Sequence, residues 1–192
     1  LLLGLIYFSF QIYCDFSGYS DIAIGTSKLF GFELMSNFKF PYFSRDIGEF
    51  WRRWHISLST WFRDYLYIPL GGSKGGKWMS IRNIFVIFIV SGFWHGANWT
   101  FIVWGLIHAM LYIPLFLKGK NRQYTRAIVA ENKWFPSLKE FFHMGSTLFF
   151  TMIAWVFFRS TTLLDSANYI YHMITKFAIP TQYRFFIIYV FI

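Results

Sequence analysis

Two histidines stand among aromatic residues and indicate chemistry on a hydroxyl group. His95 lies in the segment Ser91-Gly-Phe-Trp-His-Gly-Ala-Asn-Trp99. Apolar surroundings favour the uncharged imidazole, which can accept a proton from a hydroxyl that attacks a carbonyl carbon. Gly92 and Gly96 carry no side chain and leave room for a substrate beside the ring. We therefore expect His95 to be a general base; a buried histidine that hydrogen-bonds a neighbouring helix is the alternative.

His55 belongs to a second pattern. If Glu49–Ile68 forms one helix, Arg52, His55, Ser59 and Arg63 share one face. Another face is apolar and aromatic, and carries Trp51, Trp54, Leu58, Trp61, Phe62 and Tyr65. Two roles fit the polar face. Either His55 orients a substrate while the guanidinium groups hold a phosphate, or the bases reach lipid phosphates from a helix at the membrane surface.

The other polar residues form weaker patterns. Asp15 and Asp21 are not at helical spacing, so we expect them to cap a helix or to pair with a base such as Lys28. We expect His108 to hydrogen-bond between helices and the lone Cys14 to be a packed small side chain. The sequence contains no zinc-protease motif, nucleophile elbow or phosphate-binding loop. No metal and no bound cofactor are therefore expected.

Long apolar runs must position these residues. The run from Asn83 to Leu117 has no Asp, Glu, Lys or Arg. As one helix it would be about 52 Å long, against a hydrocarbon core of about 30 Å. We expect a break at Gly96-Ala-Asn98, which leaves a short arm, 83–95, and a full-length arm, 99–117. With so short a first arm, His95 would stop part-way through the membrane.

The flanks of this run predict its direction. Residues 71–82 and 118–139 are basic and contain a single acid, Glu131. Short basic loops usually face the cytoplasm, so the two arms are expected to form a hairpin with His95 at its tip. One steeply tilted crossing is the alternative. A second uncharged run, 141–158, predicts a further span.

Composition supports this membrane setting. Of the 192 residues, 56% are hydrophobic and 14% charged, where soluble domains have about 25% charged residues. This excludes a disordered chain and an ordinary soluble enzyme. The net charge is +9, and because apolar runs separate the bases we expect membrane lipids, and no nucleic acid, as partners.

The remaining segments complete the expected layout. Leu1–Cys14 is expected to be the tail of another span, and Ile22–Phe38 to be shielded by protein or to lie at the membrane interface. Thr161–Phe177 is mixed and is expected on the surface. The sequence ends inside an apolar run, Phe185–Ile192. We therefore expect a fragment of a longer multi-pass protein.

Four blocks of residues resemble a known family. They are Asp15-Phe-Ser-Gly-Tyr-Ser-Asp21, Phe40-Pro-Tyr-Phe43, the segment Phe50–Gly72 that begins Phe-Trp-Arg-Arg-Trp-His, and Gly92-Phe-Trp-His-Gly-Ala-Asn-Trp99. In this order and spacing they are similar to the membrane-bound O-acyltransferases (MBOATs), in particular to the bacterial branch that O-acetylates alginate-type polysaccharides. The resemblance is close over residues 10–117 and looser elsewhere. It implies that residues 1–192 are part of a single MBOAT membrane domain whose first and last spans are missing.

The resemblance also implies a fold and an activity. The fold would be all-α and polytopic, with short, broken and interfacial helices around an internal funnel, in the bacterial cytoplasmic (inner) membrane. A cytoplasmic thioester donor, acetyl-CoA or an acylated carrier protein, would supply the acyl group. The acceptor would be a hydroxyl of an exported polysaccharide, or a relay partner such as an extracytoplasmic SGNH-type acetyltransferase.

Residue roles follow from the same resemblance. The family's catalytic histidine corresponds to His95 and its second histidine to His55. The developing oxyanion would need a hydrogen-bond donor such as the indole of Trp94 or Trp99, or His55. Substrate or donor binding is expected from the remaining polar face of the 49–68 segment: Arg52, Ser59 and Arg63.

Two other functions remain open. One is D-alanyl transfer to teichoic acid from a carrier protein, within the same family; the Ile68-Pro-Leu-Gly-Gly72 and Gly96-Ala-Asn-Trp99 blocks favour the acetyl branch instead. The other is a non-enzymatic transporter or channel, in which intramembrane histidine and arginine would serve a proton or anion path.

Overall fold

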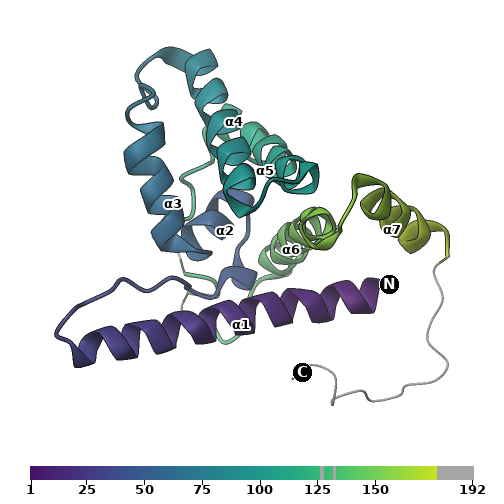
Figure 1. Cartoon of the computed structure of the whole chain (residues 1–192), viewed down its shortest axis with the longest axis horizontal. Coiled ribbons are helices and arrows are strands. Elements are labelled where there is room, and N and C mark those ends of the chain that lie inside the picture. Colours follow the sequence, from purple (N-terminus) through teal and green to yellow (C-terminus); the bar gives the residue numbers. More distant parts are fainter. Residues whose placement is uncertain (126–127, 132, 177–192) are drawn as a thin grey trace.

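The computed structural model of the protein describes residues 1–125, 128–131 and 133–176, and every regular element in them is helical. The expected all-α class is therefore confirmed for this part of the chain, whereas the apolar run 185–192 lies outside it. The elements, in chain order, are α1 (Leu2–Leu29), η1 (Pro41–Phe43), α2 (Ile47–Arg53), α3 (Ile56–Phe62), the π-helical η2 (Arg63–Tyr67), α4 (Gly76–His95), α5 (Trp99–Leu117), α6 (Leu138–Arg159) and α7 (Leu163–Thr175). Figure 1 shows α4 and α5 side by side, with α6 between this hairpin and α1.

The predicted hairpin is confirmed. Helix α4 ends at His95, and α5 begins after Asn98, whose side-chain oxygen accepts a hydrogen bond from the backbone N–H of Thr100 at 3.1 Å. Glycines let the two backbones approach closely. A Cβ placed on Gly105 would overlap the backbone oxygen of Phe88, and one placed on Gly92 would overlap that of Phe101.

The first arm is longer than predicted. Helix α4 begins at Gly76 and has 20 residues, so it includes Lys77 and Arg82 and is about 30 Å long. That length matches the hydrocarbon core. The expectation that His95 stops part-way through the membrane assumed an arm beginning at Asn83, and that assumption is wrong. A basic first turn was mistaken for a loop.

Three helices are long and apolar enough to cross a membrane: α4, α5 and α6. The predicted span at 141–158 is thus confirmed as α6, which begins with a capping box between Ser137 and Glu140. Helix α1 does not end near Cys14; it continues to Leu29 and is not one of the three candidates. Helix α7 lies over the predicted surface segment and is mostly exposed.

The segment Glu49–Ile68 is not one helix, so that prediction is wrong. Trp54 is extended (φ −107°, ψ 128°), and His55 is left-handed (φ 45°, ψ 55°) before α3 begins. A distant residue supports this break, since the side-chain oxygen of Asn37 accepts hydrogen bonds from the backbone N–H and the hydroxyl of Ser57, at 3.1 and 2.9 Å. The four polar residues therefore do not form one continuous face.

A buried ion cluster fixes α2. The Glu49 carboxylate is 1% exposed and accepts hydrogen bonds from Nη2 of Arg45 at 2.9 Å and Nη2 of Arg53 at 2.7 Å. Arg45 also pairs with Glu140 of α6 at 3.1 Å. Because a buried carboxylate is costly unless it is paired, this cluster joins α2 to α6.

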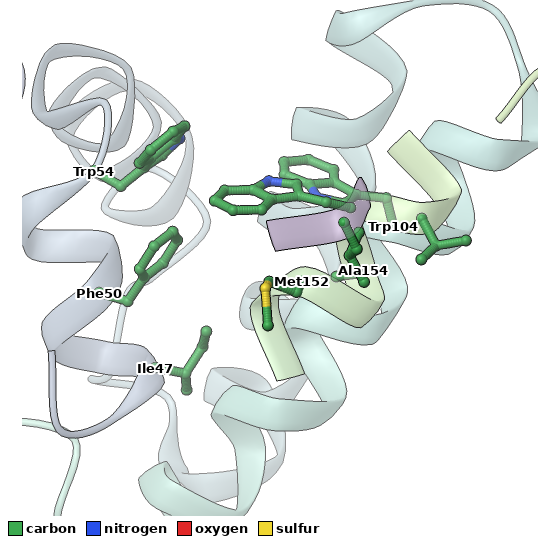
Figure 2. Close-up of a cluster of buried hydrophobic side chains, with 9 residues drawn as sticks. Ile47, Phe50, Trp54, Trp104, Met152 and Ala154 are labelled. Carbon is green, nitrogen blue, oxygen red and sulfur yellow. The ribbon is translucent and has the colours of Figure 1, made fainter. Parts of the chain in front are cut away.

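The core lies where α1, α2, α5 and α6 meet (Figure 2). Its members are mostly large apolar side chains: Leu5, Ile47, Phe50, Trp54, Trp104, Met152, Ala154, Trp155 and Val156. His108 is fully buried beside it and stacks on Phe50 at 6.4 Å between ring centroids. Among the described residues neither ring nitrogen of His108 has a hydrogen-bond partner, so the expected bond between helices is not observed.

Candidate active site

A cavity of about 670 Å³ brings the two candidate histidines into one space. His95 enters it from the end of α4 and His55 from the junction between α2 and α3. Helices α1, α5 and α6 supply most of the remaining wall, and α2 and α3 add Trp51 and Leu58. Residues 40 positions apart in the chain thus face the same volume, which is what a two-histidine site requires.

Aromatic rings surround His95. Ring centroids of Trp94, Trp104 and Phe158 lie 5.0 to 5.1 Å from that of His95. The side chain is half-buried. Among the described residues its ring nitrogens make no hydrogen bond, so they can engage a substrate in the cavity. An apolar wall of this kind limits the access of water to a reactive ester.

The orientation of His55 follows from its polar neighbours. Its Nδ1 lies 3.4 Å from the side-chain oxygen of Asn37, which can only accept a hydrogen bond. This contact favours the tautomer with hydrogen on Nδ1, so that Nε2 is left as an acceptor. Burial, with a smaller contribution from the nearby His95, lowers the pKa of His55 to about 4. The ring is therefore neutral at pH 7.

Of the other predicted site residues, some line the cavity and others lie outside it. Trp94 lines the cavity, whereas Trp99 is 73% exposed and is not part of its wall. Arg52 donates to the backbone oxygen of Asn121 at 2.8 Å. Arg63 pairs with its neighbour Asp64 at 2.7 Å and is exposed. The break at residue 55 explains this dispersal, and substrate binding by the arginines stays a prediction.

Ser59 follows the same pattern. Its hydroxyl lies 3.5 Å from the backbone oxygen of Trp54, and it is not part of the cavity wall. Ser59 thus makes no contact with the described cavity that would support its predicted binding role.

Comparison with known proteins places the sequence in a family. The model of the MBOAT, membrane-bound O-acyltransferase family, matches residues 1–116, which contain both histidines. The chain belongs to this family. The sequence prediction of the family is therefore confirmed.

Named MBOAT relatives extend the match. The chain is 47% identical over 162 residues to the probable alginate O-acetylase AlgI of Pseudomonas syringae pv. tomato, covering 84% of this chain and 29% of that protein. It is 43% identical over 156 residues (81% and 28%) to the peptidoglycan O-acetyltransferase of Helicobacter pylori. It is 37% identical over 144 residues (71% and 34%) to the teichoic acid D-alanyltransferase of Bacillus subtilis. The chain thus spans about a third or less of the length of these relatives.

We call the cavity that His55 and His95 share the histidine cavity. It also contains polar residues that the sequence analysis did not assign to the site. Gln11 and Asp15 line it from α1, and Arg159 lines it from the end of α6. Asp15 lies in the middle of α1 and forms no ion pair among the described residues, so the expectation that it caps a helix or pairs with Lys28 is wrong. The signal was present: Gln11 and Asp15 are four residues apart, which puts them on one helical face.

Proposed function

We propose that the chain forms the catalytic part of a membrane-embedded O-acyltransferase. It would move an acetyl group from a cytoplasmic thioester donor to a hydroxyl of an exported polysaccharide, or to a relay protein. The observation that supports this is the shared cavity of His55 and His95, walled by aromatic rings. A neutral imidazole in such a cavity is suited to remove a proton from an alcohol.

His95 acts as the general base. One of its ring nitrogens takes the proton from the acceptor hydroxyl while the oxygen attacks the thioester carbonyl carbon. The carbon–sulfur bond then breaks, the new ester remains on the acceptor, and the thiolate takes up the proton to leave as a thiol. Both reactants must meet beside the ring, and holding them in line lowers the barrier further.

Trp94 and His55 have distinct parts in this proposal. The developing oxyanion needs a hydrogen-bond donor, and Trp94, whose indole N–H can donate, is one of the residues that line the cavity. In the tautomer that the contact with Asn37 favours, Nδ1 carries the hydrogen and the Nε2 of His55 is an acceptor. His55 is therefore better suited to hold the acceptor hydroxyl than to stabilise the oxyanion.

The donor assay tests the function directly. Purified full-length protein is given either acetyl-CoA or an acylated carrier protein, and release of the free thiol is followed. Acetyl transfer from acetyl-CoA that is lost in the His95→Ala variant is the expected result. Transfer from neither donor, together with measurable ion or solute flux, would contradict the proposal and favour a transporter.

D-alanyl transfer is the second candidate. It is favoured by the similarity to the Bacillus subtilis protein, which is named a teichoic acid D-alanyltransferase. The relatives named as O-acetylating proteins have higher identity, 43% and 47%, and support the acetyl reaction. Thiol release only from a D-alanyl carrier protein would select D-alanyl transfer.

The location and partners belong to the same proposal. The chain is a membrane protein by family and by its three apolar helices. We place it in the bacterial cytoplasmic membrane, with its donor on the cytoplasmic side. An extracytoplasmic SGNH-type acetyltransferase, other polysaccharide machinery, or a carrier protein would be its partners.

Replacing His55 tests whether it positions the acceptor. The His55→Asn variant keeps a residue type that tolerates the left-handed backbone but removes Nε2. We expect kcat to fall by about 100-fold, as for a misplaced reactant, with little change in the KM for the thioester donor. The measurement is initial-rate kinetics on the purified full-length protein.

Lys74→Gln is the control for this variant. It removes the charge of an exposed side chain that lies outside the wall of the cavity. Its kcat should stay near that of the parent. A parental kcat in His55→Asn would favour a structural role at the membrane interface.

A further inference from the structure

A second cavity, of about 520 Å³, lies between α5 and α6. It includes the end of α5 and the start of α6, whereas His95 adjoins the start of α5. Since α5 has 19 residues, the two ends are about 28 Å apart along the helix axis. We call this cavity the α5–α6 groove.

The walls of the groove change from basic to apolar along both helices. On α5, Leu111 is followed seven residues later by Lys118 at the helix end. On α6, Lys139 stands in the first turn and Phe150 lies three turns further along. These spacings place each pair on one helical face. The groove therefore has a basic mouth and, beyond His143, Ser146 and Thr147, an apolar inner end.

The mouth carries an excess of positive charge. Lys118, Lys120 and Lys139 are exposed, and in the described part of the chain none of them lies within 4.0 Å of a carboxylate. The nearby carboxylates of Glu49 and Glu140 are paired with Arg45. Asp46 also lines the groove, and one of its carboxylate oxygens accepts a hydrogen bond from the backbone N–H of Glu49. The N-terminus of α6 adds a partial positive charge at the same place. An anionic group is the natural ligand of such a mouth.

The groove is separate from the histidine cavity. No residue of the described chain lines both. The core cluster of Figure 2 adjoins both, since Trp104 lines the histidine cavity and Ile47 lines the groove. A ligand in the groove would thus not present a thioester to His95, so the groove is unlike a donor site.

We propose that the α5–α6 groove binds an anionic phospholipid. The phosphate would lie among Lys118, Lys120 and Lys139, and the first part of an acyl chain would lie against Leu111 and Phe150. Both walls belong to helices long enough to span a membrane, so the mouth comes at headgroup level and the apolar interior at acyl-chain level. Basic pockets between spanning helices on the cytoplasmic side are a general form of phospholipid site.

Retained lipid on the full-length protein provides the test. The protein is purified from vesicles of phosphatidylcholine with phosphatidylglycerol, and bound lipids are counted by native mass spectrometry. The test variant is Lys118→Gln/Lys120→Gln/Lys139→Gln. The control variant is Lys74→Gln/Lys77→Gln/Lys133→Gln, which removes three exposed lysines outside the groove.

We expect the test variant to bind phosphatidylglycerol at least about tenfold more weakly than the parent, because each basic residue near an anionic lipid surface strengthens binding. The control variant should retain most of the parental binding. Equal loss in both variants would overturn the proposal, since it would mean that only general surface charge matters. Displacement of the lipid by coenzyme A, or equal occupancy by inorganic phosphate alone, would also overturn it.

Discussion

The His95→Ala variant of the full-length protein is expected to lose acyl transfer by about 10²- to 10⁴-fold, the usual contribution of a general base. Among the described residues, His55 is the one other histidine that lines the cavity. The Nδ1 atom of His55 contacts the side-chain oxygen of Asn37. The readout is acetyl incorporation into the acceptor, normalised to the amount of protein in the membrane. Protein amount should stay near the parental value, because the His95 side chain is only half-buried.

His172→Ala is the control for this experiment. It removes an imidazole from α7, outside both cavities, and should leave acyl transfer unchanged. Normal acetylation by the His95→Ala variant would remove His95 from the mechanism. Failure of that variant to accumulate would instead give the ring a structural role.

The second large effect is expected at Glu49, and it concerns stability. The Glu49→Ala variant leaves Arg45 and Arg53 without the carboxylate that they share. Breaking a buried ion pair on one side costs about 3–5 kcal/mol, a large part of the stability of a typical domain. We expect a clear fall in the melting temperature of the detergent-purified full-length protein.

Asp64→Ala offers a matched comparison. It breaks the ion pair between Arg63 and Asp64, whose side chains are 60% and 40% exposed, respectively. Exposed ion pairs contribute about 0–1 kcal/mol to the free energy of unfolding. Its melting temperature should stay close to that of the parent. Similar melting temperatures for the two variants would show that the Glu49 cluster does not hold α2 in place.

The spanning helices could be predicted because the membrane permits few backbone solutions. A charge-free run too long for one crossing had to break, and Gly96 marks the place. The same reasoning placed the beginning of α4 wrongly, because Lys77 and Arg82 were assigned to a loop. Long basic side chains can extend toward the interface from within a helix, so charge alone does not mark a helix end.

The set of residues that come together in the cavity could be predicted only in part. The resemblance placed both histidines in it, but the break before α3 depends on Asn37, which lies 18 residues before His55. Asp15 and Arg159 meet the cavity because α1 packs against α6. The spacing of Gln11 and Asp15 predicts that they share a helical face, but the helix that this face meets depends on contacts between distant segments, which leave no periodic pattern in the sequence.

The left-handed backbone of His55 predicts opposite effects of one substitution on thermal stability and on the proposed acyl transfer. A residue with a Cβ costs about 1–2 kcal/mol in that conformation, and glycine avoids most of this cost. Selection for higher thermal stability would therefore favour glycine at position 55. This replacement would remove the imidazole together with the conformational cost. If His55 has the proposed part in acyl transfer, variants selected for stability alone should lose activity through this position.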